Sequence, residues 1–265
     1  MRPGHVVISG ASRGIGQALA LAYAAPGAAL LLIGRDADRL EEVGRECRAR
    51  GAEATIACLD VRDAVALRAA LLAADGHRPV DLVIANAGVA LPTKGDEAVL
   101  AAAHGEIDIN LRGAVDTISP LIPAMSGRGR GQLAVVSSLA AFAPLPDSPG
   151  YSATKAALLV YGLALRERLR QRGVRVSVIC PGYVETEMGS RYRGWRPFLM
   201  SAEDAARRIV VGLECDRPVI AFPRRLAWIA RLSTFVPEGV RRLGLSGFRF
   251  SIDVQERPPR QDTPS

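Results

Sequence analysis

Short apolar runs alternate along this chain with longer segments whose apolar residues recur at helical spacing. Six runs have the length and the Val, Ile, Leu and Ala content of buried strands, and they cover residues 6–9, 28–33, 54–59, 80–85, 133–136 and 174–180. The segments between them predict helices, including 36–50, 63–74 and a mostly helical stretch over 89–125. Strands alternating with helices predict a parallel, doubly wound α/β sheet that binds ligands at the carboxyl ends of its strands.

The length and composition fit one such domain. The chain has 265 residues, of which 49% are hydrophobic and 23% charged, as is ordinary for a globular protein. We expect one domain over 1–250 and a flexible tail over 251–265, where the sequence is rich in Pro and polar residues. The uncharged run 17–34 contains Pro26-Gly27, so it predicts a helix, a turn and a strand rather than a membrane span.

The cysteines and histidines show no ligand-like grouping. Cys47, Cys58, Cys180 and Cys215 lack CxxC or Cys/His spacing, and the three histidines are scattered. This pattern predicts reduced thiols, a cytoplasmic location and no metal site. The first residues run directly into a predicted strand, so no secretory signal is expected.

Positive charge is concentrated in the last quarter of the chain. Residues 1–190 hold 20 basic and 19 acidic side chains, whereas 191–265 hold 14 arginines and 8 acidic side chains. No nucleic-acid-binding module accompanies this charge, so we expect no nucleic-acid partner. Over 224–236 an apolar stripe predicts a helix that docks on the protein itself; peripheral membrane contact through 224–243 is the less favoured alternative.

A glycine-rich loop follows the first predicted strand and precedes a helix. Its sequence is Gly10-Ala11-Ser12-Arg13-Gly14-Ile15-Gly16. Glycines at these places permit a tight turn and close backbone approach to a ligand, and the helix N-terminus behind them favours a phosphate. The loop therefore predicts a dinucleotide site, although a glycine turn without function has the same pattern.

The end of the second predicted strand indicates which dinucleotide binds. NAD-binding units usually have a carboxylate there for the ribose 2′-hydroxyl, but this chain has Gly34 followed by Arg35. An arginine pairs with a 2′-phosphate, and Arg13 can approach the same group. We therefore predict NADP(H) as cofactor. Asp36 argues against this preference, but its position at the start of a helix predicts a cap.

Polar or small residues also follow the next strands. Asp60-Val61 can meet an adenine, and the small-residue turn Asn86-Ala87-Gly88 leaves room for a flat cofactor. Asn110 lies in an apolar helical stretch and needs hydrogen-bonding partners if it is buried.

A tyrosine and a lysine share one helix face near the end of the fifth predicted strand. Tyr151 and Lys155 are four residues apart, which places them side by side, and Ser138 follows the strand. A phenol titrates near pH ~10, and lowering its pKa to about 7 requires about 4 kcal/mol. One cation about 4 Å away supplies that much at an effective dielectric constant of about 20. Tyr151 can then move a proton while Ser138 holds a substrate oxygen, although the Tyr-x-x-x-Lys pair alone also occurs by chance.

Taken together, these motifs resemble the short-chain dehydrogenase/reductase family over about 5–190, and more loosely to about 245. The resemblance implies a Rossmann-like fold with a seven-stranded parallel sheet and helices on both faces. It implies that Tyr151 is the general acid/base, that Lys155 lowers its pKa and binds the nicotinamide ribose, and that Ser138 orients the substrate carbonyl. Asn110 is implied to support a water relay. Homodimers or homotetramers are common in the family.

Further contacts follow from the same resemblance. It implies cofactor contacts at Pro181, Gly182, Val184 and Thr186. Residues 183–200 are implied to cover the substrate, and the substrate contacts we expect beyond Ser138 and Tyr151 are Ala140, Tyr183, Met188 and Trp195. Aromatic and Met side chains suit an apolar substrate, and the arginines of this segment suit an anionic group.

We predict an NADP(H)-dependent oxidoreductase that interconverts a ketone or aldehyde and an alcohol, with an apolar steroid-, acyl- or quinone-like substrate. An enzyme alternative uses the same residues for epimerisation or dehydration. A catalytically silent NADP(H)-binding regulatory or scaffold protein is the other alternative, and the intact set of Asn110, Ser138, Tyr151 and Lys155 argues against it.

Overall fold

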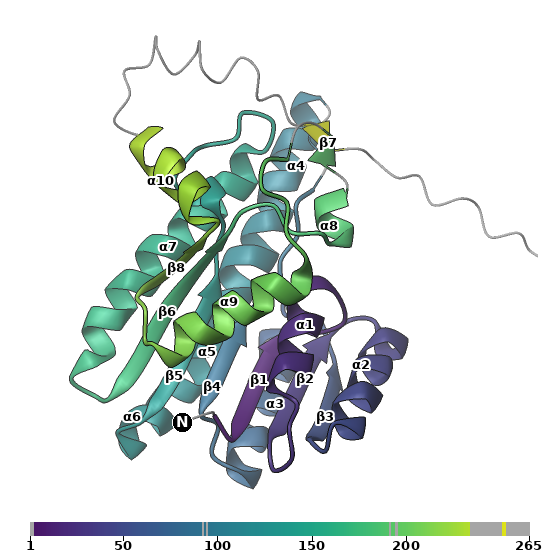
Figure 1. The fold of residues 1–265 in the computed structure, drawn as a ribbon, viewed down its shortest axis with the longest axis vertical. Coiled ribbons are helices and arrows are strands. Elements are labelled where there is room, and N and C mark those ends of the chain that lie inside the picture. The colour runs from purple at the N-terminus through teal and green to yellow at the C-terminus, as the bar shows by residue number, and fades with distance from the viewer. Residues whose placement is uncertain are drawn as a thin grey trace, which may run out of the picture.

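The computed structural model describes residues 3–91, 93, 95–190, 192–193, 196–233 and 251–252. Its centre is a parallel sheet of seven strands in the order β3-β2-β1-β4-β5-β6-β8 (Figure 1). The strands are β1 (His5–Ser9), β2 (Ala29–Gly34), β3 (Glu53–Cys58), β4 (Leu82–Ala85), β5 (Gly131–Val136), β6 (Val174–Pro181) and β8 (Val219–Phe222). The predicted seven-stranded, doubly wound sheet is confirmed.

Helices cover both faces of the sheet because successive strand residues point to opposite sides. Val6 and Ile8 face a core that includes α1 (Gly14–Tyr23), α2 (Ala37–Ala49) and α9 (Ala202–Glu214). Val7, between them, faces a second core with α3 (Ala64–His77), α5 (Gly113–Ile118), α6 (Ile122–Arg128) and α7 (Pro149–Arg170). Burial on both faces explains why the strands have continuous apolar sequences.

The strand order reverses between β1 and β4. From β1 the chain proceeds outward through β2 and β3, then returns to β4 on the other side of β1. This arrangement separates the loops that follow β1 and β4 and leaves a crevice at their carboxyl ends. The glycine loop follows β1 at this point, and Asn86-Ala87-Gly88 follows β4.

The predicted helical stretch over 89–125 is interrupted. Residues 86–91 form neither helix nor strand, α4 (Asp96–Glu106) begins later, and a π-helix, η1 (Ile107–Arg112), joins it to α5. The 3₁₀ segment η2 (Ser119–Leu121) then leads into α6. π-helical turns often occur at functional sites, and this one contains Asn110.

The seventh strand was not among the six predicted runs. β8 has only four residues and lies between Pro218 and Pro223, so its local pattern does not distinguish a strand from a turn of helix. Its pairing with β6, in which Val178 is opposite Val219, defines it as a strand. Two short strands, β7 (Tyr192–Arg193) and β9 (Ser251–Ile252), form a separate antiparallel pair.

The predicted apolar stripe over 224–236 falls partly in α10 (Arg224–Ser233). Trp228, Ile229 and Leu232 are each about 60% exposed, whereas the small residues Ala227 and Ala230 face the protein. The prediction that the large residues dock on the protein is therefore wrong for these three, because the close contact is made through alanine. Phe235 and Val236 lie outside the described residues. Within those residues, no helix combines the length and apolarity needed to cross a bilayer.

Candidate active site

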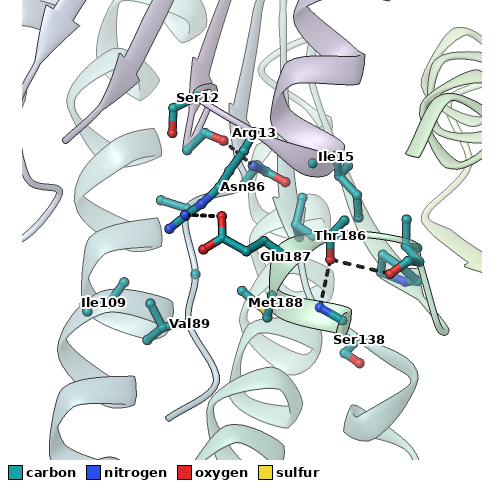
Figure 2. Close-up of a pocket in the computed structure, with 18 of the residues that line it drawn as sticks. Ser12, Arg13, Ile15, Asn86, Val89, Ile109, Ser138, Thr186, Glu187 and Met188 are labelled. Atoms are coloured by element: carbon teal, nitrogen blue, oxygen red, sulfur yellow. Dashed lines mark hydrogen bonds and ion pairs between the residues drawn. The ribbon is translucent and has the colours of Figure 1, made fainter. Parts of the chain in front are cut away.

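A cleft of about 660 Å³ opens at the carboxyl ends of the strands. It is lined by every predicted cofactor-contacting residue except Gly16: Gly10, Ser12, Arg13, Gly14, Ile15, Arg35, Asp60, Val61, Asn86, Ala87, Gly88, Tyr151, Lys155, Pro181, Gly182, Val184 and Thr186. Residues from six separate segments of the chain thus surround one cavity. Figure 2 shows part of this lining, with Ser12 and Arg13 on one side and Thr186, Glu187 and Met188 on the other.

The geometry of the glycine loop allows a ligand to lie close to its backbone. Gly10 and Gly14 have φ angles of 66° and 58°, in the left-handed region that favours glycine. Gly16 lies beneath the loop, where an added Cβ would lie 2.1 Å from the carbonyl oxygen of Gly10. A side chain at Gly10 would in turn lie 2.8 Å from Ala87 Cα. The loop therefore presents backbone to the cleft at the start of α1, which fits the pyrophosphate of a dinucleotide.

Asn86 ties this loop to the end of β4. Its side-chain nitrogen donates to the carbonyl oxygens of Ser9 and Gly10, both at 3.1 Å. The buried Ser9 hydroxyl accepts hydrogen bonds from the backbone nitrogens of Asn86 and Ala87, both at 3.2 Å. The two loops at the switch point are therefore held as one unit by four hydrogen bonds.

Tyr151 and Lys155 lie in the first two turns of α7 and both line the cleft. The lysine is 4% exposed, and its Nζ donates a 2.9 Å hydrogen bond to the carbonyl oxygen of Val136 at the end of β5. Nζ lies 5.5 Å from the centre of the Tyr151 ring. Burial lowers the pKa of Lys155 to about 8, because a low-dielectric environment disfavours the ammonium form.

The pKa of Tyr151 is raised, contrary to the expectation that Lys155 lowers it. Burial of the phenol is the largest cause, and the charges of Glu106 and Cys180 add to it; the Ser138 side chain acts in the opposite direction. Desolvation of the phenolate dominates, and Lys155 is not among the groups that shift this pKa. A further favourable charge is needed to make Tyr151 a base near neutral pH.

Two consecutive serines follow β5 and have different surroundings. Ser137 is 2% exposed, and its hydroxyl donates to the carbonyl oxygen of Lys155 at 2.7 Å, which supports α7. Ser138 lines the cleft, and its Oγ accepts a hydrogen bond from the backbone nitrogen of Ala140 at 3.1 Å. Ala140 is 9% exposed and is not among the residues that line the cleft, so its substrate contact stays a prediction; its backbone nitrogen orients Ser138.

Asn110 is fully buried in the π-helix η1 and does not line the cleft. Its Oδ1 accepts from the backbone nitrogen of Val89 at 2.7 Å, and its Nδ2 donates to the carbonyl oxygen of Val89 at 2.9 Å and to Thr154 Oγ1 at 3.3 Å. The predicted need for partners is confirmed. Asn110 thus links the segment after β4 to the helix that carries Lys155.

Glu106, which the sequence analysis missed, is also fully buried beside this group. Its Oε1 accepts from the backbone nitrogen of Leu91 at 2.9 Å, while its Oε2 has no hydrogen-bonding partner. A Cβ added to Gly150, next to Tyr151, would lie 2.6 Å from that Oε2. Burial is the largest cause of its raised pKa, with Lys155 opposing the rise. In the sequence, the only feature that points to Glu106 is its position four residues before Asn110.

The cationic side of the cleft contains residues near the end of β2. Arg35 Nη1 lies 3.6 Å from Asp60 Oδ2, and Asp36 caps α2 by accepting from the backbone nitrogen of Arg39 at 3.2 Å. The predicted cap is confirmed. Arg13 pairs with Glu187 of α8 (Glu187–Ser190) across the cleft (Figure 2). Neither Arg39 nor Glu187 was singled out from the sequence.

On the substrate side, Tyr183 and Met188 line the cleft as predicted. Burial raises the pKa of Tyr183 to about 12, so this side chain stays neutral. Arg196 also lines the cleft and donates to the carbonyl oxygen of Gly189 at 3.1 Å. Trp195 lies outside the described residues. Among the residues that are described, no three His, Cys, Asp or Glu side chains gather in a metal-binding group.

Comparisons with known proteins agree with this geometry. The family model for short chain dehydrogenases matches residues 4–197. An uncharacterized oxidoreductase of Myxococcus xanthus is 37% identical over 232 residues, which are 87% of this chain and 92% of that protein. A short-chain dehydrogenase of Sphingobium yanoikuyae in complex with NADPH has a TM-score of 0.75 at 25% identity, covering 97% of this chain and 99% of that one. One from Mycobacterium paratuberculosis bound to NAD has a TM-score of 0.73 at 26% identity, covering 82% and 94%.

A seven-stranded sheet with a glycine loop at its switch point, and a Tyr-x-x-x-Lys helix that lines the same cleft, is the arrangement of nicotinamide-dependent oxidoreductases acting on alcohol and ketone groups. The chain belongs to the short chain dehydrogenase family.

Proposed function

We propose that this protein is an NADP(H)-dependent oxidoreductase that interconverts a ketone or aldehyde and the corresponding alcohol. One observation carries the proposal: Tyr151, Lys155 and Ser138 line the same cleft as the glycine loop. Proton-transfer groups and a dinucleotide cradle therefore face one cavity. When bound, a nicotinamide cofactor would supply or accept the hydride and, in its oxidised form, would contribute a positive charge.

The protein's own groups handle the proton and the substrate oxygen. In reduction, the Tyr151 hydroxyl donates its proton to the oxygen that gains negative charge, and in oxidation it accepts that proton. The Ser138 hydroxyl, oriented by Ala140, holds the same oxygen. Lys155 stabilises the tyrosinate, and its ammonium position is fixed by the carbonyl oxygen of Val136. Asn110 acts from behind the cleft by holding Val89 and Thr154 in place.

NADP(H) is favoured over NAD(H) by the charges near the end of β2. Gly34 occupies the place where a carboxylate usually binds the ribose 2′-hydroxyl, and the cationic Arg35 follows it. Asp36 is engaged as the cap of α2, so it is not free to act as that carboxylate. Arg13 lines the same cleft.

The substrate that fits best is apolar near the reacting carbon. Tyr183 and Met188 line the cleft, and the pKa of Tyr183 is high enough to keep it uncharged. Steroid-like, acyl and quinone-like carbonyl compounds have this character. The free cysteines, two of them buried, fit a reducing cytoplasmic setting.

Self-association through α7 stays a prediction. Ala153 and Val160 are exposed on this helix, with Val160 at 67%, and Leu163 is 36% exposed. An apolar helix face of small and medium residues suits close packing against a second copy. Size-exclusion chromatography with light scattering tests it: Val160→Glu should reduce the mass to that of one chain, and an unchanged mass would contradict the use of this face.

The decisive experiment has two parts. The purified protein is titrated with NADPH and with NADH, and its oxidation of each is followed over ketosteroids, β-ketoacyl thioesters, quinones and short aldehydes. We expect tighter NADPH binding and turnover with at least one apolar carbonyl compound. Arg35→Gln should weaken NADPH binding selectively, and Arg45→Gln, an exposed arginine of α2 outside the cleft, serves as the matched control. Equal affinity of the wild-type protein for both nucleotides would overturn the NADP assignment.

A further inference from the structure

One carboxylate joins the two sides of the cofactor cleft. Glu187 Oε2 accepts a hydrogen bond from Arg13 Nη1 at 2.5 Å and another from Arg39 Nη1 at 2.9 Å. Arg13 belongs to the glycine loop, Arg39 to the first turn of α2, and Glu187 to α8 on the far side of the cleft. Figure 2 shows the Arg13–Glu187 contact within the pocket.

The two arginines reach one anionic oxygen from different elements of the fold. Arg39 is held on its other side by Asp36, whose Oδ2 lies 3.5 Å from Arg39 Nε and which also caps the helix. Arg13 reaches the same carboxylate from the glycine loop. Two guanidinium groups from different elements therefore converge on a single oxygen atom. Carboxylate and phosphate oxygens are equivalent partners for guanidinium, and a phosphate offers more of them.

The location identifies which anion competes with Glu187. Arg13 and Arg39 flank the end of β2, which is where the adenosine ribose of a dinucleotide binds in this fold. The extra anion that distinguishes NADP(H) from NAD(H) is the phosphate on that ribose. Hydrogen bonds from Arg39 and Arg13 lower the pKa of Glu187. The carboxylate is therefore ionised at neutral pH and repels a second anion.

We propose that Glu187 is an internal competitor for the 2′-phosphate of NADP(H), and that Arg39 together with Arg13 forms the site they contest. NADP(H) then binds by exchanging the Glu187 carboxylate for its 2′-phosphate, whereas NAD(H) has no group to exchange. Glu187 reduces the affinity for NADP(H) and so narrows the difference between the affinities for NADP(H) and NAD(H). This inference rests on the proposed use of NADP(H) and adds two specificity-determining residues to it.

The test is direct binding of NADPH and NADH to the full-length protein, measured by calorimetry for the wild type, Glu187→Gln and Glu185→Gln. Glu185 is exposed and two residues away, so its variant makes the same change in net charge without touching the arginines. We expect Glu187→Gln to bind NADPH about two- to fivefold more tightly, the range of an exposed ion-pair contribution, with NADH affinity unchanged. Glu185→Gln should resemble the wild type.

Variants of Arg39 distinguish competition between Glu187 and the 2′-phosphate from a general effect of net charge on nucleotide binding. Arg39→Gln should weaken NADPH binding and leave NADH binding unchanged, and Arg45→Gln is its matched control on the same helix. In Arg39→Gln/Glu187→Gln the gain from losing Glu187 should fall below the gain in the wild-type background, because the two residues share one contact. Independent, additive effects would overturn the proposal.

The remaining outcomes distinguish this inference from the function it rests on. If the wild type prefers NADPH but Glu187→Gln gains no more than Glu185→Gln, the competition is absent and the NADP assignment stands. If Glu187→Gln raises the affinity for NADH and for NADPH equally, Glu187 affects binding of the portion that the two nucleotides share, and the inference is wrong. If the wild type binds NADH at least as tightly as NADPH, the NADP assignment itself fails.

Discussion

The ammonium nitrogen of Lys155 lies 5.5 Å from the centre of the Tyr151 ring and donates a hydrogen bond to the carbonyl oxygen of Val136. The cation therefore lies beside the tyrosine ring, on the side of the sheet. Lys155 is buried and Tyr151 is partly buried, and desolvation opposes the charged form of each. The pKa of Lys155 falls to about 8 while the pKa of Tyr151 rises, so the phenol keeps its proton at neutral pH unless a further positive charge approaches it.

The first prediction concerns the hydroxyl of Tyr151. Tyr151→Phe should reduce kcat by about 100- to 10,000-fold, because proton transfer to the substrate oxygen is lost. NADPH affinity should change little, since the ring is retained. Tyr161→Phe on the same helix removes a hydroxyl that does not line the cleft and should retain activity. Normal turnover by Tyr151→Phe would show that another group moves the proton.

The second prediction concerns the pH dependence of stability due to Lys155. Its pKa of about 8 in the folded protein lies below the ordinary value of 10.5, so the unfolded chain binds more protons between these pH values. Stability therefore rises with pH across this window, by up to about 3 kcal/mol. In urea unfolding at pH 7, 8, 9 and 10, the free energy of unfolding of the wild type should rise relative to that of Lys155→Met by up to this amount. A constant difference would mean that Lys155 titrates normally.

The third prediction concerns the buried carboxyl of Glu106. Its negative charge is among the causes that raise the pKa of Tyr151. Glu106→Gln removes the charge while keeping an oxygen for the backbone nitrogen of Leu91, so the pH profile of alcohol oxidation should shift to lower pH. The exposed carboxylate of Asp108 gives the control, Asp108→Asn. An unshifted profile with reduced stability would assign Glu106 a structural role only.

The fourth prediction concerns the floor of the glycine loop. Gly16→Ala places a methyl group 2.1 Å from the carbonyl oxygen of Gly10, so the loop must move. We expect a loss of stability of about 1–3 kcal/mol or more and weaker binding of both nucleotides. Gly76→Ala in α3, where an added Cβ meets no atom within 4 Å, should instead be neutral or stabilising. Thermal unfolding and calorimetry measure both effects, and an intact nucleotide affinity in Gly16→Ala would contradict the cradle.

Much of the architecture was predictable because each part depends on local sequence. Six strands were located from runs of apolar residues, with boundaries that differ from the observed ones by no more than about two residues. The glycine loop and the Asp36 cap follow from the backbone needs of single residues, and the spacing of Tyr151 and Lys155 follows from the period of a helix. β8 was missed because four residues between prolines carry too little pattern, and it is defined by pairing with β6.

The sequence by itself determined the order of elements, the cofactor-binding loop and the identity of the residues that can move a proton. Only the tertiary structure decided the electrostatics among them. Burial raised the pKa of Tyr151 where a charge pair counted from the sequence alone predicted a fall. It also brought Glu187 to Arg13 and Arg39, which lie 174 and 148 residues away along the chain. Desolvation and long-range ion pairs depend on which atoms become neighbours, and no local pattern in the sequence contains that information.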